Sequence, residues 1–168
     1  MPGSSSEANL IRVGRLLKRL ADAIGVLLFL TAFSGFILQI FYRYVMNAPL
    51  LWTEEVTMIA FIWTVFWAAA FMTPIKEHVS FDVVYEVVSE EKRRIFNLIS
   101  MAFLIVAFIV LIPYTWDYLE FLTRKKSAVL RLPMYPIYGC YILFLIGFTI
   151  QAIHRVWSLL GKDWRDYI

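Results

Sequence analysis

Four long blocks of apolar residues, separated by short polar stretches, set the strongest constraint on how this chain folds. The blocks lie at about residues 23–42, 56–73, 95–116 and 135–157. A helix rises about 1.5 Å per residue, so roughly 20 apolar residues cross about 30 Å of membrane hydrocarbon. The chain is 61% hydrophobic and 17% charged, which is unlike a soluble domain. The sequence therefore predicts an all-α integral membrane protein with four transmembrane helices in a single domain, residues 10–168.

The N-terminal segment divides into a tail and a basic amphipathic stretch. Residues 1–9 contain three consecutive serines and no apolar pattern, so we expect a disordered tail. Residues 10–20 mix leucines with basic residues and predict an interfacial helix that lies on an anionic membrane surface before the chain turns into the first span. The expected membrane-anchoring residues are Arg12, Arg15, Lys18 and Arg19.

A cleavable signal peptide is the rival interpretation of this N-terminal region. Positive charge is followed by an apolar run and by Ala32-Phe33-Ser34, which imitates a cleavage site. The apolar run continues past that site to Tyr42, however, and is long enough to span. These features favour a retained first transmembrane helix.

The distribution of basic residues predicts the orientation of the four spans. Lys and Arg collect on cytoplasmic flanks, and with four spans both termini share a side with the loop between spans two and three. Of the 16 basic residues, eleven fall on that side and five on the other. Both termini are therefore expected in the cytoplasm. In the loop, residues 81–88 carry apolar residues on one helical face, which predicts a second, short interfacial helix.

The polar stretch between the first two blocks, residues 43–55, carries an unusual density of specific side chains. Pro49 has no N–H, so the first span should end before it. Thr53 is the expected N-cap of the next helix, with Glu54 and Glu55 in its first turn. The candidate residues for a structural turn or a partner interface are Arg43, Tyr44, Asn47, Pro49, Trp52, Glu54 and Glu55.

This stretch resembles the signature of the small membrane subunit of tripartite ATP-independent periplasmic (TRAP) transporters, the DctQ-like family. The similarity rests on Arg43-Tyr44, Asn47, Pro49, Trp52 and Glu54-Glu55. Two weaker stretches are similar to the same family, and they lie at Glu77-His78 with Asp82 and at Ser127-Ala128 with Leu132-Pro133-Met134. Lys76 departs from the pattern, because a small residue is expected before Glu-His.

The resemblance implies a partner subunit rather than an independent transporter. In that family the small subunit packs beside a large membrane subunit that holds the substrate and the sodium ions. A periplasmic binding protein delivers small organic acids to the pair. The resemblance thus implies a non-translocating scaffold in the bacterial inner membrane, with no cofactor in this chain and sodium in the large subunit. The partners it implies are the large subunit, the binding protein and membrane lipids, with no nucleic acid.

The roles expected within the first turn remain divided between two alternatives. In one, Arg43 pairs with Glu54 or Glu55, Asn47 bonds loop backbone, and Trp52 anchors the turn at the membrane boundary. In the other, these residues contact the large subunit or the binding protein. One basic cluster lies on the periplasmic side, where the chain has fewer Lys and Arg residues. It is the candidate periplasmic docking patch and is formed by Arg124, Lys125, Lys126 and Arg131.

The spans lack the residues that several other classes of membrane protein require. No ionisable residue lies in the central part of any span, which disfavours a small multidrug exporter driven by protons. His78 and His154 lie at the inner boundary, so a membrane cytochrome is disfavoured too. Glu54 and Glu55 are adjacent and diverge by about 100 degrees on a helix, a poor catalytic pair. We expect no enzyme activity. An independent small homo-oligomeric transporter remains the alternative function.

Glycine positions and the single cysteine complete the sequence pattern. Gly139 and Gly147 are eight residues apart in the fourth span, a spacing that suggests close helix contact. Gly25 and Gly35 in the first span are the weaker candidates. Cys140 lies within the fourth block and is expected to serve packing.

Overall fold

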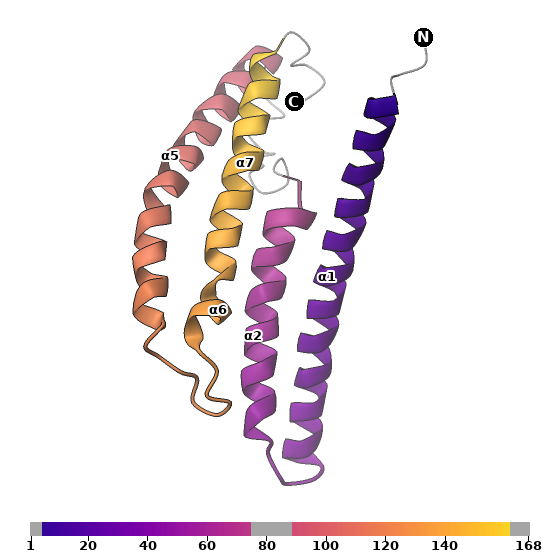
Figure 1. The fold of residues 1–168 in the computed structure, drawn as a ribbon, viewed down its shortest axis with the longest axis vertical. Coiled ribbons are helices and arrows are strands. Elements are labelled where there is room, and N and C mark those ends of the chain that lie inside the picture. The colour runs from indigo at the N-terminus through magenta and orange to yellow at the C-terminus, as the bar shows by residue number, and fades with distance from the viewer. Residues whose placement is uncertain (1–4, 75–88, 162–168) are drawn as a thin grey trace. The chain divides into compact units, whose positions relative to one another are not determined.

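The computed structural model describes residues 5–74 and 89–161, and every long element in it is helical (Figure 1). The helices are α1 (Ser5–Tyr44), α2 (Leu51–Trp67), the π-helix η1 (Ala68–Met72), α5 (Glu90–Leu122), α6 (Met134–Tyr138) and α7 (Cys140–Leu160). Four helical segments are long and apolar enough to cross a membrane. A helix satisfies its own backbone groups where no water is present, which is why apolar blocks of this length fold in this way. The predicted all-α fold with four spans is confirmed.

Helix α1 runs from Ser5 to Tyr44 without a break. The expected turn between a basic surface helix and the first span is therefore not found, and one helix contains both. Within the segment that was expected to be a tail, the helix begins at Ser5. The predicted interfacial helix at 81–88, with Lys76, Glu77, His78 and Asp82, lies outside the described residues.

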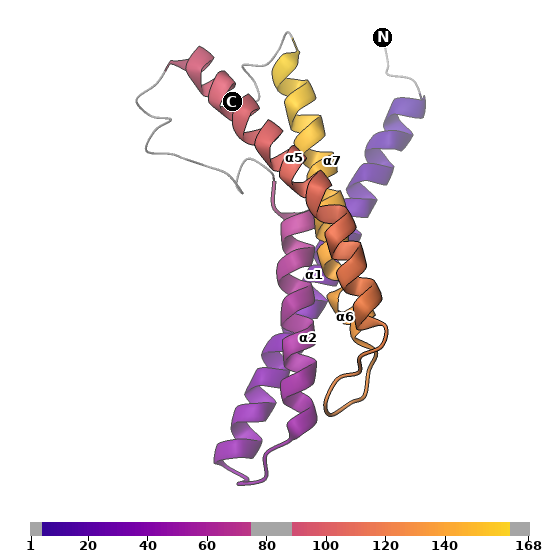
Figure 2. The same ribbon diagram turned by 90° about the vertical axis from the view of Figure 1, so that its left-hand side faces the viewer.

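Helices α1 and α2 pack side by side as the first hairpin, and residues 126–132 belong to the same compact unit (Figure 2). Glycines bring the two helices together: a Cβ built on Gly35 would collide with the Thr57 hydroxyl, and one on Gly25 would collide with the Met72 sulfur. At the Gly25 end of the pair, the Trp67 indole N–H donates to the Ala21 carbonyl oxygen at 2.9 Å. The Met72 and Thr57 side chains thus pack directly on the glycine backbone of α1.

Helices α5, α6 and α7 form the second hairpin (Figure 2). Its core contains Met101, Phe148 and Ala152, with Phe108 and Phe144 packed against it. The Phe108 and Phe148 ring centroids are 4.9 Å apart, and Phe144 lies 5.7 Å from each of them. At one end, the Arg94 guanidinium Nε donates to the Leu159 carbonyl oxygen at 2.8 Å, which satisfies a free carbonyl in the last turn of α7.

One of the two glycines predicted to allow close helix contact in the fourth span, Gly139, does not lie at such a contact. Gly139 lies at the break between α6 and α7, where the nearest atoms to an added Cβ are the Pro136 and Tyr135 carbonyl oxygens of the same segment. Gly25 and Gly35, the weaker candidates, are the positions at which α2 approaches α1. Spacing along one helix does not reveal which face meets the neighbour, and that is why the sequence ranked them incorrectly.

Candidate functional site

The first turn begins with an unusual ending of α1. The Ala48 amide donates to the Tyr42 carbonyl oxygen at 3.0 Å, and the Met46 amide donates to the Phe41 carbonyl oxygen at 3.3 Å. Between them Asn47 has a φ of 52°, in the left-handed region. Asparagine enters this region more readily than most residues with a side chain, and a left-handed residue commonly ends a helix. The role of Asn47 in the structure is thus conformational, and no side-chain bond from it to loop backbone is found among the described residues.

Helix α2 begins earlier than predicted. Its N-cap is Leu50, directly after Pro49, and no side chain caps the helix. Thr53 is fully buried, and its hydroxyl donates to the Leu50 carbonyl oxygen at 2.6 Å. The prediction that Thr53 is the N-cap was therefore wrong. The extended conformation of Leu50 after Pro49 already starts the helix, and Thr53 lies within the first turn.

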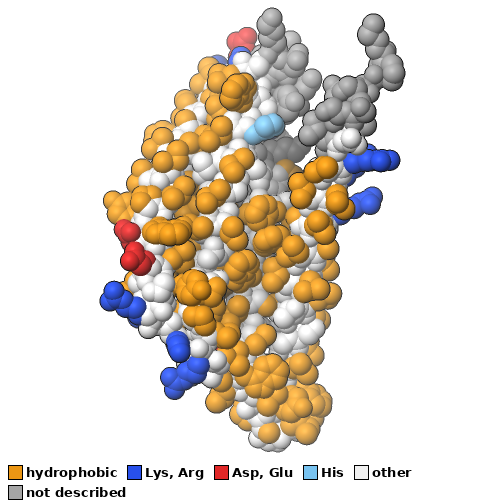
Figure 3. All heavy atoms as spheres, in the orientation of Figure 1, with side chains coloured by type: hydrophobic (Ala, Val, Ile, Leu, Met, Phe, Trp, Pro, Cys, Tyr) orange, Lys and Arg blue, Asp and Glu red, His pale blue; other side chains and the backbone are white. Residues whose placement is uncertain are grey.

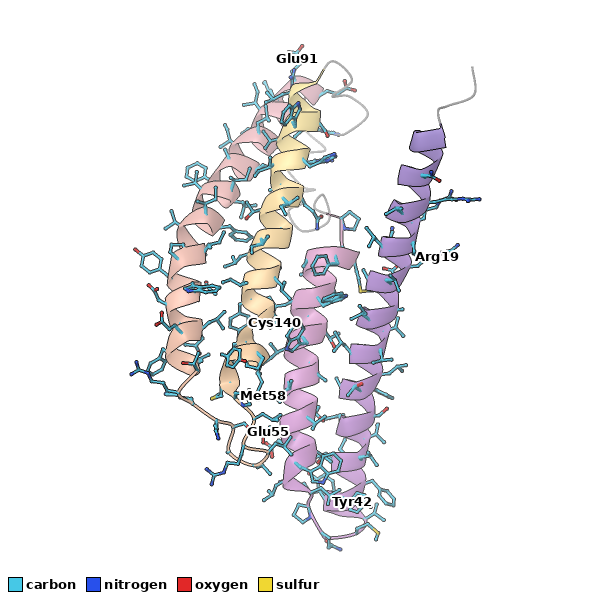
Figure 4. All side chains as sticks on the ribbon, viewed as in Figure 1. Arg19, Tyr42, Glu55, Met58, Glu91 and Cys140 are labelled. Atoms are coloured by element: carbon cyan, nitrogen blue, oxygen red, sulfur yellow. The ribbon has the colours of Figure 1, made fainter. Side chains whose placement is uncertain are left out.

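Glu55 connects the start of α2 to a distant loop of the same compact unit (Figure 4). Its Oε2 atom accepts hydrogen bonds from the Val129 amide at 3.1 Å and from the Leu130 amide at 2.9 Å. The Ser127 hydroxyl also hydrogen-bonds the carboxylate. Hydrogen bonds to a charged acceptor are roughly twice as strong as neutral ones. We call residues 126–132 the anchored loop, because Glu55 holds their backbone against α2.

The anchored loop also contains hydrogen bonds of its own. The Ser127 amide donates to the Leu132 carbonyl oxygen at 2.8 Å, and the Leu132 amide donates to the Ser127 Oγ at 2.9 Å. Arg131, between them, has a φ of 57°. Arginine rarely adopts this conformation, so the loop has a defined shape that its contacts must maintain.

The predicted ion pair of Arg43 is not formed in this structure. The Arg43 guanidinium lies over the Tyr44 ring, 5.7 Å from its centroid. Glu55 is occupied by loop amides, and Glu54 lines a groove between α1 and α2. Adjacent positions on a helix point about 100 degrees apart, so the two carboxylates reach different surroundings. The turn is shaped by its backbone and by Glu55 rather than by an arginine bridge.

The remaining candidate residues of the turn are on its surface. Tyr44 and Trp52 are 71% and 46% exposed, as expected of rings that meet a membrane boundary or a partner. Pro49 is also exposed.

The basic residues of the possible docking patch are all exposed, but they belong to two compact units. Lys126 and Arg131 are in the anchored loop, which is part of the first unit. Arg124 and Lys125 follow α5 in the second unit, and the Lys125 ammonium lies 4.5 Å from the Phe121 ring centroid. Of these four residues, therefore, only Lys126 and Arg131 belong to the loop whose backbone Glu55 binds.

The basic residues near the N-terminus lie on one side of α1. Because each residue turns a helix by about 100 degrees, Arg12, Arg15 and Arg19 share an arc of roughly 60 degrees. All three are exposed, as is Lys18, and Figure 4 shows Arg19 pointing outward from the helix. The hydrophobic side chains of the described helices dominate the visible face in Figure 3. In three of the four spans only 11% of the most apolar window is buried, so most of this surface must face lipid or another protein.

The contact between Glu55 and the anchored loop has only a weak signal in the sequence. Ser127 and Leu132 were noted for their family resemblance, but nothing local indicated that they fold against a residue more than 70 positions earlier. Across residues 5–74 and 89–161, no group of three or more His, Cys, Asp or Glu side chains is placed to hold a metal ion. The distinctive feature of the site is thus the Glu55 carboxylate, which accepts hydrogen bonds from the backbone of the anchored loop.

Comparisons with known proteins agree with the motif and the fold. The family model described as tripartite ATP-independent periplasmic transporters, DctQ component, matches residues 33–162. A curated relative, the C4-dicarboxylate TRAP transporter small permease protein DctQ of Vibrio cholerae serotype O1, is 28% identical over 88 residues. That alignment covers 52% of this chain and 38% of the relative.

Proposed function

Since this chain belongs to the DctQ component family of tripartite ATP-independent periplasmic transporters, we propose that it is the small, non-translocating scaffold subunit of a sodium-coupled transporter. In this proposal it packs beside a large transport subunit and receives, with it, a periplasmic binding protein loaded with a small organic acid. The relative from Vibrio cholerae is named for C4-dicarboxylates, which supports carboxylates as the substrate class.

The observation that carries the scaffold role is the absence of charge from the central part of every span. No Asp, Glu, Lys or Arg occurs in residues 23–42, 56–73 or 95–116, and residues 135–157 contain only Arg155, near the inner end of the fourth span. An ion or proton path through a membrane normally uses ionisable residues that face the bundle interior. We therefore assign the coupling sodium ions and the substrate to the large subunit.

The proposed location is the bacterial inner membrane, with both termini in the cytoplasm. Support comes from the excess of Lys and Arg on the side of the termini and from the basic side of α1 at Arg12, Arg15 and Arg19. Anionic lipids concentrate on the cytoplasmic side of many membranes and attract such residues. This orientation places the first turn and the anchored loop in the periplasm.

In that orientation, the anchored loop is our candidate contact for the binding protein. Glu55 fixes the loop backbone, and Lys126 and Arg131 are exposed at its ends. A loop held in one shape loses less entropy on binding than a free one. Exposed cations also steer a partner with acidic surface and make association sensitive to salt.

Reconstitution tests the scaffold proposal directly. The full chain, the large subunit and the binding protein are placed in proteoliposomes with an inward sodium gradient, and uptake of labelled dicarboxylates is measured. We expect uptake from the complete set and none from this chain alone. Uptake by this chain alone would instead support the independent homo-oligomeric transporter, and full uptake without it would remove the requirement for a scaffold.

Charge reversal tests the docking contact separately. Lys126→Glu with Arg131→Glu should slow association of the binding protein with the reconstituted complex by about tenfold at low salt, and by less at high salt. Arg19→Glu, on the proposed cytoplasmic side, is the matched control and should leave association unchanged. Equal effects of the two changes would contradict the proposed contact.

A further inference from the structure

The first hairpin carries an open, largely apolar groove of about 570 Å³. Phe29, Phe33 and Phe36 line it from α1, and Met58 and Phe61 line it from α2. The groove lies wholly within the first compact unit. It is therefore a property of this hairpin itself.

The groove has one polar end, and the remainder is lined mainly by apolar side chains, with Thr57 and Thr64 among them. Gln39 from α1 and Glu54 from α2 lie at the end near the first turn. From Phe29 to Gln39 the helix rises about 15 Å, half of the roughly 30 Å thickness of membrane hydrocarbon. The groove thus has the length of one lipid leaflet, with its polar end at the level of the lipid head groups.

Charge identifies which head group suits that end. Within the part of the chain that the structure describes, Glu54 is the only ionisable residue that lines the groove, and its side chain is exposed. A carboxylate accepts hydrogen bonds from a primary ammonium and repels an additional anion. Glu55 is not among the residues that line the groove, and its Oε2 atom accepts the Val129 and Leu130 amides.

The geometry points to a single phospholipid with a primary amine in its head group: Glu54 binds the ammonium, and one acyl chain lies in the groove along the phenylalanine rings. Packed helices have axes about 8–10 Å apart, and the contact of Gly35 with Thr57 keeps this pair close. A helix is about 10 Å wide with its side chains, too wide to enter between them, whereas an acyl chain fits. This proposal does not depend on the scaffold role.

Native mass spectrometry of the full chain, purified and then exposed to equal amounts of three dioleoyl lipids, tests the proposal. The lipids are phosphatidylethanolamine, phosphatidylcholine and phosphatidylglycerol. We expect phosphatidylethanolamine to be retained about fivefold more than the others, the effect of one exposed charge-assisted contact. Equal retention of the three lipids by the unmodified chain would overturn the proposal.

Variants of residues that line the groove distinguish the contribution of its charged end to lipid binding from that of its apolar side chains. Glu54→Gln should remove the preference for the amine head group, and Glu54→Lys should transfer the preference to phosphatidylglycerol, a gain that misfolding cannot produce. Asp117→Asn, which neutralises an exposed carboxylate on α5 away from the groove, is the control and should change nothing. Ala32→Phe, at a buried lining position, should reduce retention of all three lipids. Unchanged preference in Glu54→Lys would overturn the proposal.

A photocrosslinker tests which molecule occupies the groove in the membrane. Benzoylphenylalanine replaces Phe33 in the full chain, which is expressed in native membranes with its transporter partners and then irradiated. An adduct with the mass of a phospholipid supports the proposal. An adduct with another protein, or with a second copy of this chain, would show that a protein covers the groove and would overturn it.

Discussion

The two helical hairpins are held together by different means. In the first hairpin the Met72 and Thr57 side chains pack directly on Gly25 and Gly35 of α1, and polar contacts from Trp67 and Glu55 secure the ends. In α5–α7 a cluster of phenylalanine rings fills the centre. The span that contains α7 buries 28% of its most apolar window, whereas the spans of α1, α2 and α5 each bury 11%.

This difference indicates that the two hairpins use their apolar side chains in different ways. A ring-filled core gives many dispersion contacts and resists rearrangement. A pair of helices joined by small residues leaves much of its apolar surface free, and here that surface includes the groove beside Glu54. The first hairpin therefore carries the groove, and the second carries the ring-filled core.

The largest expected effect is the loss of a core ring in the second hairpin. Phe148→Ala should lower the free energy of unfolding by about 3 kcal/mol, because it removes a 4% exposed ring that packs on Phe108 and Phe144. Thermal unfolding in detergent measures the loss. Phe103→Ala, which truncates a 75% exposed ring on α5, is the control and should cost far less. Equal losses would mean that this cluster does not stabilise the second hairpin.

The next effect concerns the polar contact of the first hairpin. Glu55→Ala removes the acceptor for the Val129 and Leu130 amides and should lower the melting temperature, by less than Phe148→Ala does because both hydrogen bonds are exposed. Hydrogen exchange of these two amides should become faster. Glu54→Ala is the neighbouring control and should leave their exchange unchanged. If both variants accelerate exchange equally, Glu55 does not hold the loop.

A smaller loss of stability is expected where Gly35 of α1 lies against Thr57 of α2, because an added side chain there causes a steric clash. Gly35→Ala places a methyl group against the Thr57 hydroxyl and should cost about 1.5 kcal/mol as the helices separate. Adding Thr57→Ala should recover most of that loss, because the obstructing atoms are removed. Gly14→Ala is the control, since an added Cβ there meets no atom within 4 Å. Thermal unfolding of the three variants measures the effects, and a loss that persists in the double variant would contradict this explanation.

Some of these features could be predicted from the sequence and others could not, for physical reasons. The four spans follow from block length alone, which is a local property, and the structure confirms them. The position of the first turn likewise follows from Pro49 and its polar neighbours. The partner of Glu55 is set by tertiary contact with a loop more than 70 residues away. Of the two roles expected for Arg43, the ion pair with Glu54 or Glu55 is not formed: the guanidinium lies over the Tyr44 ring, and backbone amides reach the Glu55 carboxylate. The alternative role, contact with a partner, stays a prediction.

The smallest expected changes in the free energy of unfolding come from the two residues of the first unit that have a left-handed backbone conformation. Asn47 and Arg131 have φ values of 52° and 57°, but only asparagine adopts this region readily. Arg131→Asn should therefore raise the free energy of unfolding by about 0.5 kcal/mol, while Asn47→Ala should lower it by a similar amount. Arg124→Asn is the control, because Arg124 has no positive φ and its replacement brings no such gain. Thermal unfolding measures all three. A loss of stability in Arg131→Asn would mean that the arginine side chain itself, rather than the backbone and Glu55, maintains the shape of the anchored loop. The first hairpin would then depend on a surface charge that the second does not need.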